Sequence, residues 1–264
     1  MSPFVSLAAL AALIAVPAMA QAAPGDALQL ALDRGLAVDR HEEAAWHVTD
    51  ELVADIADPA AAGIRGWVVT DTGDGLEVTS WKPEGDGRAG VYAARCAGEE
   101  VVDRRVLEGE AALLSEAEQA LIAALRAVDP SGLERCSDQP LNSMELAPSA
   151  QGDLALVYYL APQASLDLVS LGGHHRYEVR DGKVVSDRAF IMSCIDMPTA
   201  VAAQAPEALV ISDLLDPVLT NMHVFALLAA RLQLLAIIDE ATGAIEASAG
   251  QPRIRLVERE QATS

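Results

Sequence analysis

The sequence predicts an α+β fold, built as an antiparallel sheet meander with a few helices. Many short apolar segments, rich in Val and Tyr, have the length and composition of strands. Asp181-Gly182 separates two of these segments and is typical of a type I′ hairpin turn, because both central residues of that turn need positive φ. Only a few segments repeat apolar residues at the three- and four-residue spacing of an amphipathic helix.

Two segments in the N-terminal half are expected to be helical. Residues 24–58 carry apolar side chains along one face, namely Ala44, Ala45, Val48, Leu52 and Ile56. Asp58-Pro59 ends this helix, since the residue before a proline disfavours helical angles. Residues 115–128 begin with Ser115-x-x-Glu118, a capping box in which each side chain accepts from the other residue's backbone N–H.

The remaining apolar segments are expected to be strands. Residues 154–160 are continuously apolar, which predicts a strand buried on both faces. His175, Tyr177 and Val179 alternate with charged residues, which predicts a half-buried strand that returns through the 181–182 turn. Further strands are expected at residues 64–70, 76–81, 91–96, 101–107, 141–146, 166–171, 208–215 and 254–257.

Length, apolar content and charge limit the classes of protein. The 264 residues fit one large domain or two small ones, and an apolar share of 52% is ample for a core. We expect a single globular domain over residues 21–264, with a sub-boundary near 130–150 as the alternative. The net charge of −21 repels nucleic-acid phosphates and anionic lipids, so nucleic acid is not an expected partner.

Residues 1–20 have the features of a secretory signal peptide. An apolar stretch of about a dozen residues precedes Ala18-Met19-Ala20, which fits an Ala-x-Ala cleavage site. The stretch is too short for a comfortable membrane span, and no later segment reaches transmembrane length. We therefore expect a periplasmic or secreted protein without an integral membrane segment after cleavage.

Three cysteines predict one disulfide and one free thiol if the protein folds in an oxidising compartment. Three pairings are open. Cys136–Cys194 is favoured, because Cys136 lies in a polar loop and Cys194 ends a predicted strand, whereas Cys96 lies in an alternating strand. Three reduced, buried cysteines are the alternative. No two cysteines have Cys-x-x-Cys spacing, which excludes a thioredoxin-type motif and a zinc ribbon.

The sequence carries no recognisable catalytic signature, and the candidate catalytic residues are His174, Cys194 and His223. A hydrolase site would need them to converge, with Cys194 and a histidine forming a thiol dyad. His174 and His175 are adjacent on a predicted strand, so they are expected to point to opposite faces, one outward and one inward.

No metal or cofactor is expected. His41 and His47 are six residues apart and so diverge by roughly 120° around a helix, unlike the i, i+4 histidines of a zincin. The acidic 41–47 segment is therefore interpreted as a solvated helix face. The acidic residues of segment 71–77 lack EF-hand spacing and are interpreted as a hairpin turn.

Several short motifs resemble a group of uncharacterised exported bacterial proteins. They are Ala44-Ala45-Trp46-His47 with Thr49-Asp50, Gly66-Trp67-Val68-Val69, Gly172-Gly173-His174 with Tyr177, Ser193-Cys194, and His223-Val224-Phe225. The resemblance implies no activity. It implies two strands over residues 224–238, with His223-Val224-Phe225 as a strand start, whereas the Ala, Leu, Arg and Gln content of that segment favours a helix.

The function expected from these observations is a non-catalytic periplasmic binding or interaction module, with a protein or small molecule of the envelope as its partner. The alternative is a hydrolase-type enzyme with its site near His174, Cys194 and His223. A purely structural envelope protein is a third interpretation. None of them names a ligand or a reaction.

Overall fold

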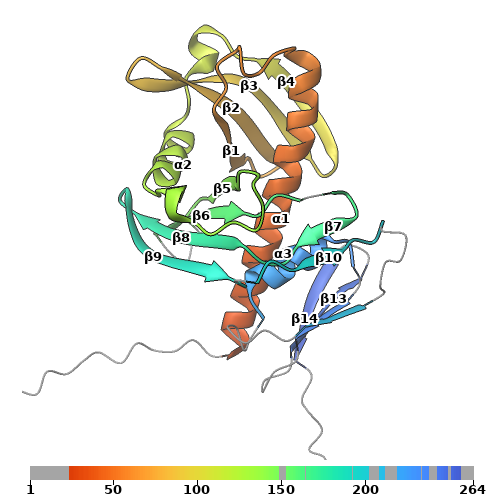
Figure 1. Ribbon diagram of the computed structural model, residues 1–264. Helices are drawn as coiled ribbons and strands as arrows, with labels where there is room; N and C mark the ends of the chain where they lie inside the picture. The colour runs from red at the N-terminus through yellow and green to blue at the C-terminus, as the bar shows by residue number, and fades with distance from the viewer. Residues whose placement is uncertain are drawn as a thin grey trace, which may run out of the picture.

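The computed structural model describes residues 24–148, 153–163, 165–191, 193–201, 208–211, 219–232, 234–237, 243–248 and 251–256. The predicted signal peptide lies outside these residues. The described part of the chain forms helices and mainly antiparallel sheets, which confirms the α+β prediction (Figure 1).

A long N-terminal helix, α1 (Pro24–Asp55), runs through the middle of the molecule and packs on elements from both halves of the chain (Figure 1). Its 32 residues correspond to about 48 Å at the helical rise of 1.5 Å. The predicted apolar face is buried, because Ala44, Ala45, Val48 and Leu52 pack against one sheet. The N-terminal part of α1 packs instead against the C-terminal helix.

The first sheet contains β1 (Gly66–Asp71), β2 (Leu76–Glu84), β3 (Gly87–Ala97) and β4 (Glu100–Val106), paired antiparallel in that order. Its two faces pack against different helices, because successive side chains of a strand point to opposite faces. Val69 and Tyr92 pack on α1, while Val68 and Trp81 pack on α2 (Glu116–Arg126). The capping box predicted at the start of α2 is present, with Glu118 N–H donating to Ser115 Oγ at 3.2 Å.

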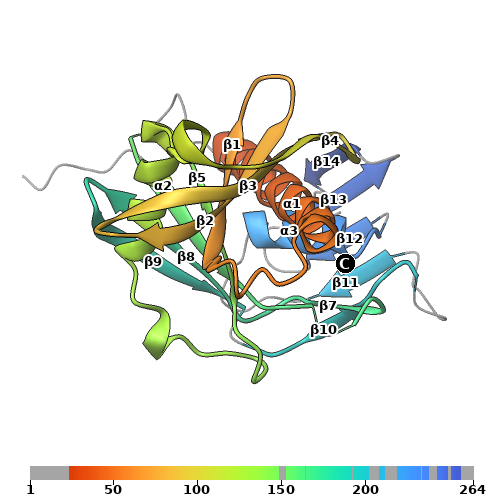
Figure 2. The ribbon, with the colours of Figure 1, turned by 90° about the horizontal axis from the view of Figure 1, so that it is seen from above.

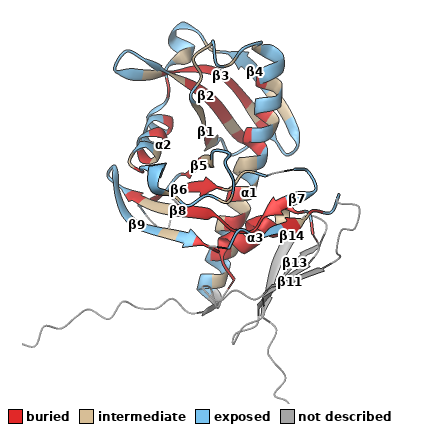
Figure 3. Cartoon of the chain, in the orientation of Figure 1, coloured by how far each residue is buried: buried red, intermediate tan, exposed pale blue. Residues whose placement is uncertain are grey.

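The second sheet contains β5 (Asn142–Leu146), β6 (Ala155–Leu160), β8 (His174–Arg180) and β9 (Lys183–Phe190), again in antiparallel order. The prediction that 154–160 is buried on both faces is confirmed, since every residue of β6 is buried (Figure 3). The predicted turn between β8 and β9 is also confirmed, with φ of 49° at Asp181 and 69° at Gly182.

Two smaller sheets complete the described chain. Between β6 and β8 the chain leaves the second sheet to form β7 (Leu168–Ser170), which pairs with β10 (Asp196–Pro198). Near the C-terminus, β11 (Ala208–Ile211), β12 (Leu234–Ile237), β13 (Gly243–Ser248) and β14 (Gln251–Leu256) form a sheet in which β11 and β12 are parallel (Figure 2). Residues 212–215 of the predicted strand 208–215 lie outside the described residues.

In the first half of segment 224–238 the structure has the helix that the composition favours, and not the strand that the resemblance implies. Asn221–Ala229 forms helix α3, and only Leu234–Ile237 is a strand. His223 is the third residue of α3, where its Nδ1 accepts from Thr220 N–H at 3.0 Å and caps the helix. The helix is buried almost all round, so it lacks the polar face that would identify it as a helix from periodicity.

Candidate functional site

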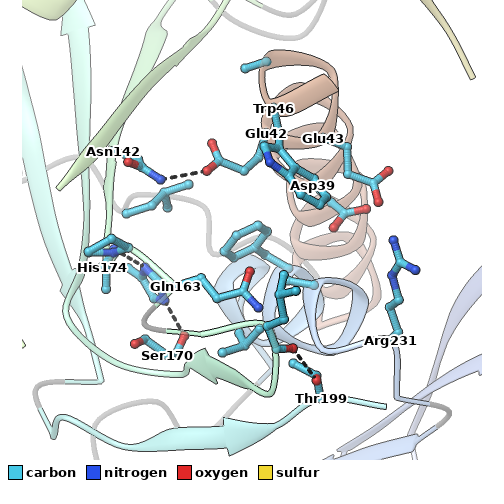
Figure 4. Close-up of a pocket in the computed structure, with 18 of the residues that line it drawn as sticks. Asp39, Glu42, Glu43, Trp46, Asn142, Gln163, Ser170, His174, Thr199 and Arg231 are labelled. Carbon is cyan, nitrogen blue, oxygen red and sulfur yellow. Dashed lines mark hydrogen bonds between the residues drawn. The ribbon is translucent and has the colours of Figure 1, made fainter. Parts of the chain in front are cut away.

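A cleft of about 750 Å³ lies between α1 and the segment that connects β6 to β7 (Figure 4). Volumes of roughly 300–1,000 Å³ are usual for small-molecule sites. The lining residues come from α1, β1, β5, the 160–170 segment, the start of β8, the 199–201 segment and α3 with the turn after it. The cleft therefore collects residues that are far apart in the sequence, from Asp39 to Arg231.

The α1 wall of the cleft is acidic and aromatic. Asp39, Glu42, Glu43 and Trp46 follow one another at helical spacing, so they lie on one face of α1 (Figure 4). Trp46 is 52% exposed, which is unusual for an indole, and its ring stacks on His47 with centroids 5.5 Å apart. The interpretation of segment 41–47 as a solvated face holds for Glu43 and Trp46, which are exposed, whereas Glu42 is partly buried; all three line the cleft.

The opposite wall and the floor of the cleft are mainly apolar. The end of β6 contributes Leu160, the segment after it contributes Ala161 and Leu166, and helix α3 contributes Phe225 and Ala229. Leu166 at the rim is 69% exposed. An apolar surface left open beside a concave site is a common feature of ligand-binding grooves.

Burial changes the protonation of the acidic wall. Burial, and then the neighbouring charge of Glu43, raise the pKa of Asp39 to about 7. Burial also raises the pKa of Glu42, although Asn142 Nδ2 donates to its Oε1 at 3.0 Å. Glu42 Oε2 has no hydrogen-bond partner among the described residues. A buried carboxylate oxygen that no protein group donates to is costly, which favours the protonated form of Glu42 in agreement with its raised pKa.

Arg231 is the basic residue of the lining, apart from His174. It lies beside Asp39 and Glu43 in Figure 4, and its charge lowers the pKa of Asp39 in opposition to the effect of burial. Within the described residues, no ion pair of 4.0 Å or less joins Arg231 to a carboxyl of the α1 wall.

His174 lines the cleft, but both of its ring nitrogens already have partners. Its Nδ1 accepts from Ala161 N–H at 3.1 Å, so its Nε2 donates to the Ser170 carbonyl at 2.9 Å. The ring is 1% exposed and packs edge-on against Phe225. Burial lowers the pKa of His174 to about 4, so the ring is neutral near pH 7. His174 thus holds the two ends of the 161–170 segment in place.

The three candidate catalytic residues do not converge. Cys194 forms a disulfide with Cys136, across a Cα–Cα distance of 5.2 Å, and therefore has no thiol. This disulfide lies beside a second, smaller cavity of about 270 Å³. His223 caps α3 and is not among the residues that line the 750 Å³ cleft. Only His174 of the three lies at the cleft.

The disulfide prediction is confirmed, and the glycine at position 173 is explained by it. A Cβ at Gly173 would meet Cys136 Sγ at 2.7 Å, and Gly173 has φ of 78°. Only glycine lets the chain pass this close to the disulfide with that backbone angle. Cys96 is the free, buried cysteine of the predicted arrangement.

His174 and His175 point to opposite faces of β8, but the prediction that one points outward is wrong. His175 is only 7% exposed, and its Nε2 lies 3.0 Å from the Glu134 carbonyl oxygen. The loop that carries Cys136 covers this face of the sheet. The alternating sequence of β8 predicts a half-buried strand, so it does not indicate that the face of His175 is covered as well.

Sequence reasoning missed Asp39, Asn142 and Arg231 as members of a site. Their positions, on α1, on β5 and after α3, share no local motif. The signal that could have indicated the cleft is the acidic and aromatic series on one face of α1, ending in Trp46. Large aromatic side chains are seldom exposed on a fully solvated helix face.

Among the described residues, no three His, Cys, Asp or Glu side chains are grouped closely enough to hold a metal ion. No helix in the described part of the chain is both long and apolar enough to cross a bilayer.

Comparison with known proteins gives no assignment. No family model, curated protein or solved structure matches this chain. The resemblance to exported bacterial proteins, carried by short motifs, therefore stays a prediction.

Proposed function

We propose that this chain is a non-catalytic binding protein that takes a small amphipathic molecule into the cleft beside α1. The observation that carries the proposal is the cleft itself: a cavity of about 750 Å³ with an apolar floor and a few polar groups gathered on one wall. That combination of apolar lining with a few convergent polar groups is typical of small-molecule sites.

The geometry around the histidines supports binding over hydrolysis. A thiol dyad needs a free Cys194, and that sulfur is bonded to Cys136. A general base needs a nitrogen lone pair that faces the substrate, and both nitrogens of His174 are engaged with backbone groups.

The proposal includes export to the periplasm or secretion. The Cys136–Cys194 disulfide supports it, because disulfides persist mainly in oxidising compartments. The apolar segment before Ala20 supports it independently.

The test is saturable binding of N-phenyl-1-naphthylamine, an uncharged apolar fluorophore, to the full chain. Leu166→Ser removes apolar surface from the rim and is expected to weaken binding by about fivefold, from roughly 1 kcal/mol of lost burial. Leu113→Ser is the matched control, because Leu113 is similarly exposed at 75% and does not line the cleft. Absence of saturable binding, or equal effects of the two variants, would overturn the proposal.

A further inference from the structure

We propose that the cleft selects amphiphiles whose polar end is a cation, an alkylammonium or guanidinium group held by Asp39 and Glu43 beside Trp46. This inference rests on the proposed function, since it names the class of ligand for the same cleft. It goes further by assigning the head group, the residues that hold it and the charge types that are excluded.

The charges of the lining favour a cation. Asp39, Glu42 and Glu43 all come from one face of α1, and Arg231 opposes them from the turn after α3. An anionic head group would meet three carboxyl groups. An uncharged ligand would remove water from those carboxyl groups without supplying an opposite charge, which is costly. A cation supplies the charge that the lining lacks.

The arrangement also gives the two ends of the ligand different surroundings. Asp39 and Glu43 are one helical turn apart, so their carboxyl groups flank the same point of the cleft (Figure 4). The Trp46 indole follows on the same face, where its ring could contact an alkylammonium through a cation–π interaction. The apolar body would then lie against Leu160, Phe225 and Ala229 on the floor.

The protonation of Asp39 supports the same assignment. Its raised pKa, about 7, reflects burial next to Glu43, and it is moderated by Arg231. The positive charge of Arg231 is therefore too weak to offset the effects of burial and of Glu43 on this pKa. A bound cation would favour its ionised form, because an opposite charge nearby lowers the pKa of an acid.

The experiment compares three competitors with the same ten-carbon chain: decyltrimethylammonium, decanol and decanoate. Each displaces N-phenyl-1-naphthylamine from the full chain at pH 8, where Asp39 is mainly ionised, at concentrations below micelle formation. We expect decyltrimethylammonium to act at about a tenfold lower concentration than decanol, because its fixed positive charge is attracted by the two ionised carboxyl groups and by the Trp46 ring. Decanoate is expected to be the weakest of the three.

Charge-neutral variants assign the preference to the two carboxyl groups. In Asp39→Asn/Glu43→Gln, the ratio of the decanol to the decyltrimethylammonium midpoint is expected to fall toward one. The matched control is Asp26→Asn/Asp50→Asn, which makes the same change in net charge at two exposed positions of α1 outside the cleft and should keep the ratio. If the double variant fails to fold, Glu43→Gln alone, at an exposed position, should lower the ratio by at least about threefold.

The outcomes separate the two levels of the proposal. Failure of the fluorophore and of all three competitors to bind would refute the cleft as a binding site. Binding of the fluorophore and decanol without an advantage for the cation would refute this inference and leave the proposed function standing. If the ratio of the two midpoints falls equally in the cleft variant and in the control, the preference for a cation comes from the net charge of −21, and the inference is refuted.

Discussion

Glu145 places a carboxyl group in the interior of the second sheet, and its removal should change how stability depends on pH. The residue lies on β5 opposite Val157 and is 2% exposed. Its Oε1 has no hydrogen-bond partner among the described residues. Burial raises its pKa from 4.5 to about 8, against the smaller opposing effect of its own backbone N–H.

The sign of the effect follows from proton binding. A carboxyl group with a raised pKa keeps its proton in the folded state, while the unfolded chain releases it above pH 4.5. Glu145 therefore costs stability progressively as pH rises from 4.5 to 8, and the cost is nearly constant above that range. The loss in the free energy of unfolding is about 3 kcal/mol at pH 7, at roughly 1.4 kcal/mol per pKa unit, and less than about 1 kcal/mol at pH 5.

Glu145→Gln is the appropriate perturbation, because glutamine has nearly the shape of the protonated acid and cannot ionise. We expect the variant to gain about 2–3 kcal/mol over the parent chain between pH 5 and pH 7. Any difference in amide packing is the same at both pH values and cancels from this gain. The assay is urea unfolding followed by tryptophan fluorescence at several pH values.

The control is Glu99→Gln, in the exposed turn between β3 and β4. Its stability difference from the parent should stay within about 0.5 kcal/mol at every pH. A difference between Glu145→Gln and the parent that is the same at pH 5 and pH 7 would refute the argument. It would mean that Glu145 is ionised in the folded protein.

Three further predictions test the fold. Replacing Cys136 and Cys194 together by serine should cost about 4 kcal/mol on the chain-entropy model, and reduction of the parent chain should lower its urea midpoint to that of the variant. Gly35→Ala should lower the melting temperature, because its Cβ would lie 2.8 Å from a backbone oxygen of α3, whereas Gly132→Ala, with open space around it, should not. Ser115→Ala should cost about 1 kcal/mol in urea unfolding by removing the cap of α2, and an unchanged midpoint would contradict that cap.

The elements that could be predicted are those set by local chemistry. The capping box at Ser115 and the positive-φ turn at Asp181-Gly182 each involve neighbouring residues, so the sequence carries the whole signal. The continuously apolar β6 is similar, since burial on both faces leaves no alternation to interpret.

The elements that could not be predicted depend on tertiary packing. Helix α3 has no polar face, so its sequence does not distinguish a buried helix from buried strands. His175 is covered by a loop that arrives from the region of Glu134. The cleft was missed for the same reason, because Asp39, Asn142 and Arg231 come together only when three distant segments pack.

The length of α1 has a consequence for the order of folding. Its middle packs on the first sheet, but its N-terminal part packs on α3, where Gly35 lies against Val224. Contacts between chain segments so far apart close a large loop, which slows folding. The first sheet can therefore assemble on α1 using only the first half of the chain. The N-terminal turns of α1 can pack only after α3, in the last third of the chain, has been made. A ribosome-bound or truncated chain that ends before α3 should expose that part of α1, including Leu28 and Leu32, to chaperones and proteases.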